Sequence, residues 1–319
     1  MHLRPFSATI FGNDPSQRWR KIVTQTIGVV GLGAMGMGMA QSLVRAGFVV
    51  KGYDIAPGPG QRLAEAGGHA AATVAEAAAG ADVLIVMVVN AAQAEDVLFG
   101  SGGGAAALPA GSLVMLSCTV APAFARKTAD RLAAMGLEML DAPVSGGPIR
   151  SAEGSLSVMA SGAPALFEKY AGVLEAIAAN VYRMGDAPGL GSVMKSINQL
   201  LAGVHLTAMG EAFVFGIKQG IDPRQMYEVI CASAGGSWMF QNRGEHILDN
   251  DYTPRSAVDI WGKDLGIVLE TGRENRLALP LAAIAHQMFL AASAQGMGRM
   301  DDAAIVKIYA QLAGVEMEG

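Results

Sequence analysis

Cysteine and aromatic side chains are scarce in this sequence. The 2 cysteines, Cys118 and Cys231, lie far apart, and neither belongs to a CxxC pair. The sequence therefore predicts neither a disulfide framework nor a zinc site, and it favours a reducing compartment, the cytoplasm. Aromatic residues make up only 6% of the chain, whereas glycine and alanine are abundant. This composition favours helices packed closely on a sheet or on one another over a β-sandwich.

The sequence also lacks a basic excess, long apolar runs and metal-ligand patterns. Its 23 Lys and Arg residues against 28 Asp and Glu residues give a net charge of −5 at pH 7, so nucleic acid is not an expected partner. The longest uninterrupted apolar run, Val83–Val89, is far shorter than the ~20 residues that span a bilayer. No membrane segment is expected. The 5 histidines show no HxxxH-type spacing, and no metal is implied.

Short apolar runs alternate with segments of helical spacing in the first half of the chain. Residues 1–25 mix charges with proline and glycine, and we expect them to form an irregular N-terminal extension. The apolar runs that follow begin at Thr26, Val49, Val83, Leu113 and Met139. Because strands that alternate with helices imply right-handed crossovers, residues 26–188 are predicted to form an α/β domain with a doubly wound parallel sheet.

The pattern changes to continuous helical spacing near Gly189. Residues 190–218 have helical character throughout, and later helical segments begin near Asp222, Ala257, Pro280 and Ala303. A chain of 319 residues is long enough for two domains of ordinary size. Residues 189–319 are therefore predicted to form a second, all-helical domain that a long helix joins to the first.

A glycine-rich turn follows the first predicted strand and opens a predicted helix. In "GLGAMG", Gly31, Gly33 and Gly36 have the G-x-G-x-x-G spacing, which allows a tight turn, close approach of a pyrophosphate, and close packing of helix on strand. Asp54 ends the second predicted strand, where a carboxylate accepts hydrogen bonds from an adenosine ribose and repels a 2′-phosphate. The pattern predicts NAD rather than NADP, bound by residues Gly31, Leu32, Gly33, Ala34, Met35, Gly36 and Asp54.

Four motifs in order along the chain resemble the β-hydroxyacid dehydrogenase family, which includes 3-hydroxyisobutyrate dehydrogenase and tartronate semialdehyde reductase. They are "GLGAMG", "DAPVSGG" at 141–147, "GLGSVMKSINQ" at 189–199 and "KDL" at 263–265. The resemblance implies a Rossmann-like NAD-binding domain and a helical domain for substrate binding and dimerisation. Strings such as "GSWMFQNR" and "DYTPRSAVDIWGKDLG" are most similar to the L-threonate dehydrogenase branch, whose members oxidise C2 of a four-carbon sugar acid with NAD.

Other substrates and a non-enzymatic role stay open at this point. The same machinery could reduce tartronate semialdehyde or oxidise 3-hydroxyisobutyrate. A non-catalytic NAD-binding protein on the same fold is a second alternative, although Ser145, Lys195 and Lys263 of the family motifs are intact.

Hydride transfer from an alcohol requires a base for the hydroxyl proton, and Lys195 is the candidate. The resemblance gives Lys195 the catalytic position, and the lysine stands nearly alone among apolar residues. Burial lowers the pKa of a lysine toward the range that a base needs at neutral pH. Asn198 and Gln199, three and four residues further on, share its helical face. Either amide could contact the substrate, since the family often has its Asn at the position of Gln199.

The resemblance assigns the remaining contacts. Ser145, Gly146 and Gly147 correspond to the substrate carboxylate site, because a hydroxyl and unobstructed backbone amides suit an anion. Lys263 corresponds to a lysine near the nicotinamide, and Val89, Asn90 and Thr119 to cofactor contacts along the sheet edge. In this sequence "MVVN" replaces the family's common Met-Leu-Pro-Asn. The long helix and the apolar second domain favour a homodimer or homotetramer.

Overall fold

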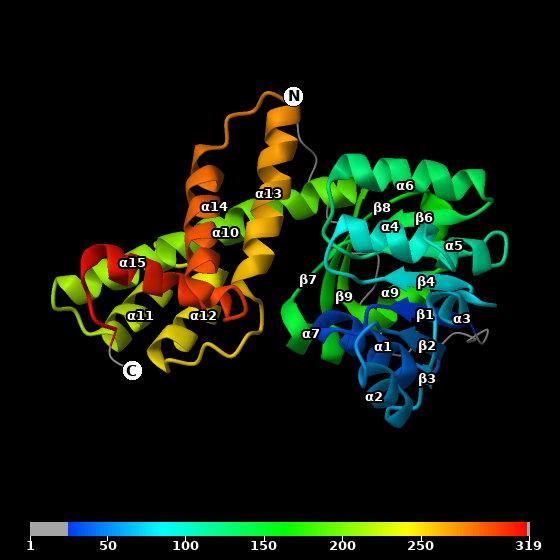
Figure 1. Ribbon diagram of the computed structural model, residues 1–319, viewed down its shortest axis with the longest axis horizontal. Coiled ribbons are helices and arrows are strands. Elements are labelled where there is room, and N and C mark those ends of the chain that lie inside the picture. Colours follow the sequence, from blue (N-terminus) through cyan, green and yellow to red (C-terminus); the bar gives the residue numbers. More distant parts are fainter. Residues whose placement is uncertain (1–24, 318–319) are drawn as a thin grey trace. The chain divides into compact units, whose positions relative to one another are not determined.

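The computed structural model describes residues 25–317, so the predicted extension at residues 1–25 lies almost entirely outside the described residues. The chain divides into two compact units, an N-terminal unit that ends at Lys195 and a C-terminal unit that begins at Ser196. Each unit has its own arrangement of helices and strands (Figure 1).

A mixed sheet of nine strands forms the centre of the N-terminal unit as far as the chain is described, in the order β3-β2-β1-β4-β5-β6-β8-β7 with β9 beside β8. The pairs among β1 to β6 are parallel, but β8 runs antiparallel to β6 and β7, which the strand-helix alternation did not predict. The strands are β1 (Thr26–Val30), β2 (Val49–Tyr53), β3 (His69–Ala70), β4 (Val83–Val86), β5 (Leu113–Leu116), β6 (Glu138–Asp141), β7 (Val144–Ser145), β8 (Leu156–Ser161) and β9 (Ala178–Gly185).

Helices cover both faces of this sheet (Figure 1), as the doubly wound prediction requires. In β4, Val83 and Ile85 face one core while Leu84 and Val86 face the other, because side chains alternate along a strand. The helices of this unit are α1 (Ala34–Arg45), α2 (Pro59–Glu65), α3 (Val74–Ala78), α4 (Ala91–Phe99), α5 (Gly104–Ala107), α6 (Pro122–Ala134), α7 (Gly147–Glu153), α8 (Pro164–Lys169) and α9 (Ala171–Ile177).

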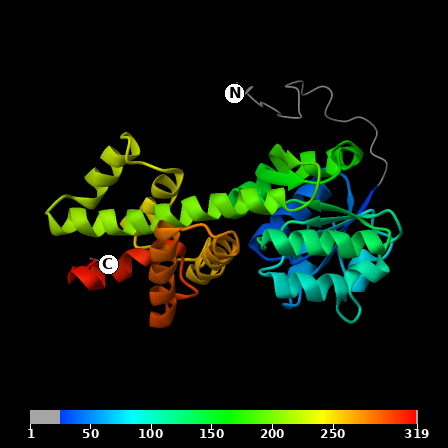
Figure 2. The ribbon, with the colours of Figure 1, turned by 90° about the horizontal axis from the view of Figure 1, so that it is seen from above.

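The long predicted helix is continuous from Leu190 to Lys218, and Figure 2 shows α10 as one unbroken element. Its first turns belong to the N-terminal unit, and the rest lies in the C-terminal unit. The described remainder of the C-terminal unit is helical, as predicted: α11 (Pro223–Cys231), α12 (Trp238–Leu248), α13 (Val258–Glu274), α14 (Pro280–Ala292), the π-helical turn Ser293–Met297, the 3-10 turn Asp302–Ala304 and α15 (Ile305–Ala313).

A buried ionic cluster fixes the C-terminal unit from within. Arg243 Nε on α12 lies 2.6 Å from Asp302 Oδ1, and Trp261 Nε1 on α13 donates a hydrogen bond of 2.8 Å to Asp302 Oδ2. His246 Nδ1 lies 2.9 Å from Asp301 Oδ1. Burial raises the pKa of Asp302 to about 6, against the opposing effect of the Arg243 guanidinium. Three segments of the unit are therefore held by charges that water does not screen.

Candidate active site

Each glycine of the first turn has the geometry that its predicted role needs. Gly31 has φ +91°, and a Cβ there would lie 2.2 Å from the carbonyl oxygen of Met87. A Cβ on Gly36 would lie 1.8 Å from the carbonyl oxygen of Gly31, so only glycine lets α1 approach the turn. Gly33, in contrast, has no atom within 4 Å of the position that a Cβ would take. The backbone is therefore tight on both sides of an open position at the N-terminus of α1, as pyrophosphate binding requires.

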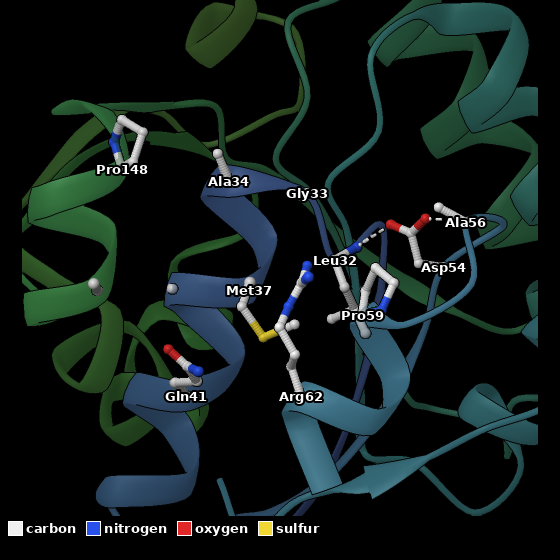
Figure 3. A pocket seen from close by; sticks show the side chains of 12 residues that line it. Leu32, Gly33, Ala34, Met37, Gln41, Asp54, Ala56, Pro59, Arg62 and Pro148 are labelled. Atoms are coloured by element: carbon white, nitrogen blue, oxygen red, sulfur yellow. Dashed lines mark hydrogen bonds between the residues drawn. The ribbon is translucent and has the colours of Figure 1, made fainter. Parts of the chain in front are cut away.

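Asp54 anchors this turn to the end of β2. Its Oδ2 accepts a hydrogen bond of 2.7 Å from the backbone N–H of Leu32, and its Oδ1 accepts one of 2.8 Å from that of Ala56 (Figure 3). Each carboxylate oxygen has a second lone pair for a ligand hydroxyl. Asp54 thus has both a structural role and the acceptor capacity that a ribose diol needs.

A cavity of about 400 Å³ opens beside the turn in the N-terminal unit. Its walls combine apolar surface with one carboxylate and one guanidinium, a combination that fits the adenosine half of a dinucleotide. Figure 3 shows Gly33, Asp54 and Arg62 around it. The lining residues are Leu32, Gly33, Ala34, Met37, Gly38, Gln41, Asp54, Ala56, Pro59, Arg62, Pro148 and Ala152.

Arg62 is a lining residue that the sequence prediction missed. Arg62 lies eight positions after Asp54, and α2 brings it to the same cavity. A short helix that directly follows the second strand was the available signal. Arg62 matters because an arginine near the ribose can accommodate a 2′-phosphate.

The turn from β7 into α7 contains Ser145, Gly146 and Gly147. Both glycines have positive φ, +137° and +74°, and no atom lies within 4 Å of a Cβ placed on Gly147. All three residues are partly exposed. The turn begins in β7, so the sheet holds its backbone on one side. The other side is open at Gly147, as expected for an anion site.

Lys195 is 8% exposed on α10, at the end of the N-terminal unit. The burial that the sequence predicted for this lysine is therefore present. Gly191, one turn earlier, packs against backbone, since a Cβ there would lie 2.4 Å from the carbonyl oxygen of Asp141. The helix face at Gly191 therefore lies against the backbone of the strands and not against open space.

A chain of polar contacts links the remaining predicted residues within the C-terminal unit. Asn198 Nδ2 donates to Gln199 Oε1 at 2.9 Å, and Gln199 Nε2 donates to Asp264 Oδ2 at 2.5 Å. Lys263 Nζ forms an ion pair of 2.6 Å with Asp264 Oδ1. The structure therefore brings Asn198, Gln199 and Lys263 together through Asp264. Both polar atoms of the buried Gln199 amide are used in this chain, whereas Asn198 is only partly buried.

Among the sheet-edge residues, Asn90 has a capping role. Its Oδ1 accepts the backbone N–H of Gln93 at 2.9 Å at the start of α4, and Gln93 Oε1 in turn accepts the N–H of Val89 at 2.9 Å. Val89 is 50% exposed and Thr119 is partly buried. The cofactor contacts assigned to Val89, Asn90 and Thr119 stay predictions. No cluster of metal-ligating side chains occurs within residues 25–317.

Comparison with known proteins agrees with this geometry. Residues 26–185 match the family described as the NAD binding domain of 6-phosphogluconate dehydrogenase, and residues 189–309 match that described as NAD-binding of NADP-dependent 3-hydroxyisobutyrate dehydrogenase. An L-threonate dehydrogenase of Cupriavidus necator is 53% identical over 93% of this chain and 99% of its own length. The chain belongs to the 3-hydroxyisobutyrate dehydrogenase-like family.

Two further relatives extend the comparison. An L-threonate dehydrogenase of Escherichia coli is 50% identical over 92% of this chain and 96% of its own length. A crystal structure from Salmonella typhimurium, described as 3-hydroxyisobutyrate dehydrogenase, superimposes with a TM-score of 0.84 at 49% identity, covering 89% of this chain and 99% of that one. The protein is thus an NAD(P)-dependent dehydrogenase that acts on a CH–OH group, similar to L-threonate dehydrogenases, and the non-catalytic alternative is not retained.

In this dehydrogenase α10 is, of the helices described, the one that is long and apolar enough to cross a membrane by length and composition, with 44% of its most apolar window buried. The prediction based on uninterrupted apolar runs overlooked it because polar residues interrupt the helix. Ser192, Lys195 and Gln199 are all buried on it. We interpret α10 as a core helix of the dehydrogenase fold.

Proposed function

We propose that this dehydrogenase oxidises L-threonate at C2 to the 2-oxo acid, with NAD as coenzyme and Lys195 as general base. The observation that carries the proposal is the similarity to named L-threonate dehydrogenases at about half identity over nearly the whole chain. The buried lysine and the open glycine turn at 145–147 support it.

In the proposed reaction the protein handles the proton and the carboxylate. The backbone amides at Gly146 and Gly147 and the Ser145 hydroxyl donate hydrogen bonds to the substrate carboxylate. Lys195, as a neutral amine, takes the C2 hydroxyl proton as the C2–H bond breaks. When bound, the nicotinamide supplies the acceptor for the hydride. Lys195 is 8% exposed, so most of its side chain is removed from water.

We propose Asn198 rather than Gln199 as the amide that contacts substrate. Gln199 uses its NH₂ on Asp264 and its carbonyl on Asn198. Among the described residues, Asn198 is engaged only through its NH₂, so its carbonyl oxygen is available to a substrate hydroxyl. Lys263, held by Asp264, is proposed to contact the coenzyme or substrate near the nicotinamide.

NAD is proposed as the preferred coenzyme because Asp54 follows the second strand, at the position where a carboxylate binds an adenosine ribose in this type of fold. The negative charge of the carboxylate repels a 2′-phosphate, and its oxygens accept the ribose hydroxyls of NAD. Arg62 in the same cavity weakens this preference, since its guanidinium attracts phosphate. The ratio of kcat/KM for NAD and NADP measures the balance between these two side chains.

A substrate panel tests the proposal. NADH formation with C3 to C6 hydroxy acids should give the highest kcat/KM with L-threonate, and NMR of the product should show a carbonyl at C2. Lys195→Ala should lower kcat by about 10²- to 10⁴-fold, the range of general acid-base catalysis. Lys127→Ala, at an exposed position of α6 in the same unit, is the matched control and should stay within about twofold of wild type. A Lys195→Ala enzyme with near-normal kcat would rule out the general base role.

Oxidation of 3-hydroxyisobutyrate is the second candidate, favoured by the description of the Salmonella structure, and reduction of tartronate semialdehyde is a third within the family. Both substrates have a carboxylate for the 145–147 turn but a shorter or branched chain. A kcat/KM that is highest for either compound in the same panel would replace L-threonate as the substrate.

We further propose a homodimer or homotetramer in the cytoplasm. In the C-terminal unit, Phe215 and Leu312 are 68% and 74% exposed and line an apolar hollow of about 350 Å³ with Val214 and Tyr309. A second copy that covers this surface would remove it from water. Sedimentation analysis should give a dimer or tetramer, and Phe215→Glu should shift the population toward monomer.

A further inference from the structure

A buried carboxylate at the end of β6 is hydrogen-bonded to the first turn of α10. Asp141 is fully buried, and its Oδ2 accepts the backbone N–H of Gly189 at 2.9 Å and that of Ser192 at 2.8 Å. Its Oδ1 accepts the Ser192 hydroxyl at 2.7 Å. The first N–H groups of a helix have no partner within the helix, so a side chain about 50 residues earlier in the sequence supplies the N-terminal cap of α10.

Two more contacts make this junction tight. Ser161 Oγ on β8 accepts the N–H of Gly191 at 3.0 Å and donates to Asp141 Oδ2 at 3.3 Å. A Cβ on Gly191 would lie 2.4 Å from the carbonyl oxygen of Asp141 and 2.5 Å from that of Met159. The first turn of α10 therefore lies directly on β6 and β8, and the carboxylate holds the backbone of that turn.

Burial of the Asp141 carboxylate at the start of α10 costs free energy. Burial raises the pKa of Asp141 above its ordinary value, although the hydrogen bonds from Ser192, Gly189 and Ser161 counteract the rise. The anion is compensated by the positive end of the helix dipole as well as by these donors. A neutral side chain would avoid the cost of burial, but an aliphatic one could not accept two backbone amides.

Asp141 is connected to both halves of the proposed chemistry inside the N-terminal unit. Along the chain it precedes Ser145 by four residues, and through hydrogen bonds it holds Ser192, which lies less than one helical turn before Lys195. We propose that Asp141 is a positioning residue that sets the place of the Lys195 amine relative to the turn at 145–147. This inference rests on the proposed role of Lys195 as the base.

Comparison of Asp141→Asn with Asp141→Ala tests the inference. An asparagine carbonyl at the Oδ2 position keeps both backbone donors, and its NH₂ can donate to Ser192 Oγ, so Asp141→Asn should keep kcat within about fivefold. Asp141→Ala removes every acceptor and should lower kcat by about a hundredfold, the cost of misplacing a reacting group by ~1 Å. The KM for NAD should change by less than about threefold in both variants, because the cavity at Asp54 is untouched.

A control and a direct readout separate positioning from general loss of stability. Asp82 also accepts a backbone amide in this unit, that of Thr26 at 2.9 Å, and Asp82→Ala should lower the melting temperature without lowering kcat. Hydrogen exchange of the amides at Gly189 and Ser192 should speed up at least about tenfold in Asp141→Ala and little in Asp141→Asn. If Asp141→Ala folds too poorly for assay, Ser192→Ala, which removes the hydroxyl that donates to Asp141 Oδ1 and keeps both backbone donors to Oδ2, should show an intermediate loss of kcat.

The outcomes distinguish this inference from the proposed function. If Lys195→Ala is inactive but Asp141→Ala keeps kcat, or if the exchange of the two amides does not change, positioning by Asp141 is wrong and the base assignment stands. Equal losses of kcat in Asp141→Asn and Asp141→Ala would also overturn it, since charge and not geometry would then matter. If Lys195→Ala stays active, the assignment of Lys195 as the base is wrong, and the positioning role of Asp141 is wrong with it.

Discussion

The two glycines at the start of α1 offer a test that separates coenzyme binding from folding. Gly33 has an extended backbone, φ −67° and ψ −170°, and no atom lies within 4 Å of a Cβ placed on it. Alanine fits this position without strain, and it should raise stability slightly, by about 0.4–1 kcal/mol, because the unfolded chain loses freedom. The melting temperature of Gly33→Ala should therefore be unchanged or a few degrees higher.

Coenzyme binding by Gly33→Ala should nevertheless fall sharply. The new methyl group would occupy the space through which a pyrophosphate approaches the amides at the helix N-terminus. Loss of one or two hydrogen bonds to a charged group, at about 1.5–3 kcal/mol each, amounts to about 3 kcal/mol, which is about a hundredfold in Kd. NADH fluorescence titration measures this Kd, and thermal unfolding measures stability on the same sample.

Gly36→Ala is the matched variant with the opposite expected effect on folding. Its Cβ would lie 1.8 Å from the carbonyl oxygen of Gly31, so α1 or the turn must move. Overpacking of this kind costs about 3 kcal/mol, or about 6–12 °C in melting temperature for a domain of this size. If Gly33→Ala binds NADH as wild type does, the pyrophosphate does not lie over Gly33. If Gly33→Ala unfolds as early as Gly36→Ala, the open space at Gly33 is wrong.

Three further predictions concern charge. Burial raises the folded-state pKa of Asp141 above the ordinary value of 3.8, so the stability contributed by the protonated carboxyl is fully present below pH 3.8 and is lost as pH rises through the raised pKa. The melting temperature of Asp141→Asn minus that of wild type should therefore increase from pH 4 to pH 7. A difference that stays constant over this pH range would contradict the prediction. Arg243→Met should destabilise the protein by about 3–5 kcal/mol, more at pH 8 than at pH 5, because Asp302, with a pKa of about 6, is neutral at the lower pH; urea unfolding at both pH values decides. Asp54→Asn should raise the ratio of kcat/KM for NADP to that for NAD at least about tenfold by removal of a like charge, and addition of Arg62→Ala should reverse part of the gain.

The parts of the fold that local patterns specify could be predicted from the sequence. The strands at Thr26–Val30 and Leu113–Leu116 and the helix at Leu190–Lys218 occur where apolar runs and helical spacing predicted them. The antiparallel part of the sheet could not be predicted in this way. β8 (Leu156–Ser161) runs antiparallel to both β6 and β7, and the direction of a strand depends on its partners and not on its own side-chain periodicity.

The residues of the candidate site also fall into those that local patterns predict and those that depend on tertiary packing. The glycine turn and Asp54 were predictable because their spacing along the chain reflects the geometry of one strand-turn-helix unit. The hydrogen bond from Gln199 to Asp264 joins residues 65 positions apart, and Arg62 reaches the cavity beside the glycine turn through the orientation of α2. No local pattern contains these contacts, since they depend on how separate elements pack.

Asp54 and Asp141 have the same structural role at two places in the N-terminal unit. Each stands at or just after the end of a strand, and each accepts two backbone amides from segments that begin another element. Strands in the middle of a sheet are the most rigid parts of the unit, whereas the turns that meet ligands have few internal hydrogen bonds. A strand-end carboxylate transfers that rigidity to a turn or to a helix terminus. Partly exposed Asp54 can share its lone pairs with a ligand, but buried Asp141 cannot, so Asp54 can both hold the turn and bind, whereas Asp141 can act on the reaction only through the helix it holds.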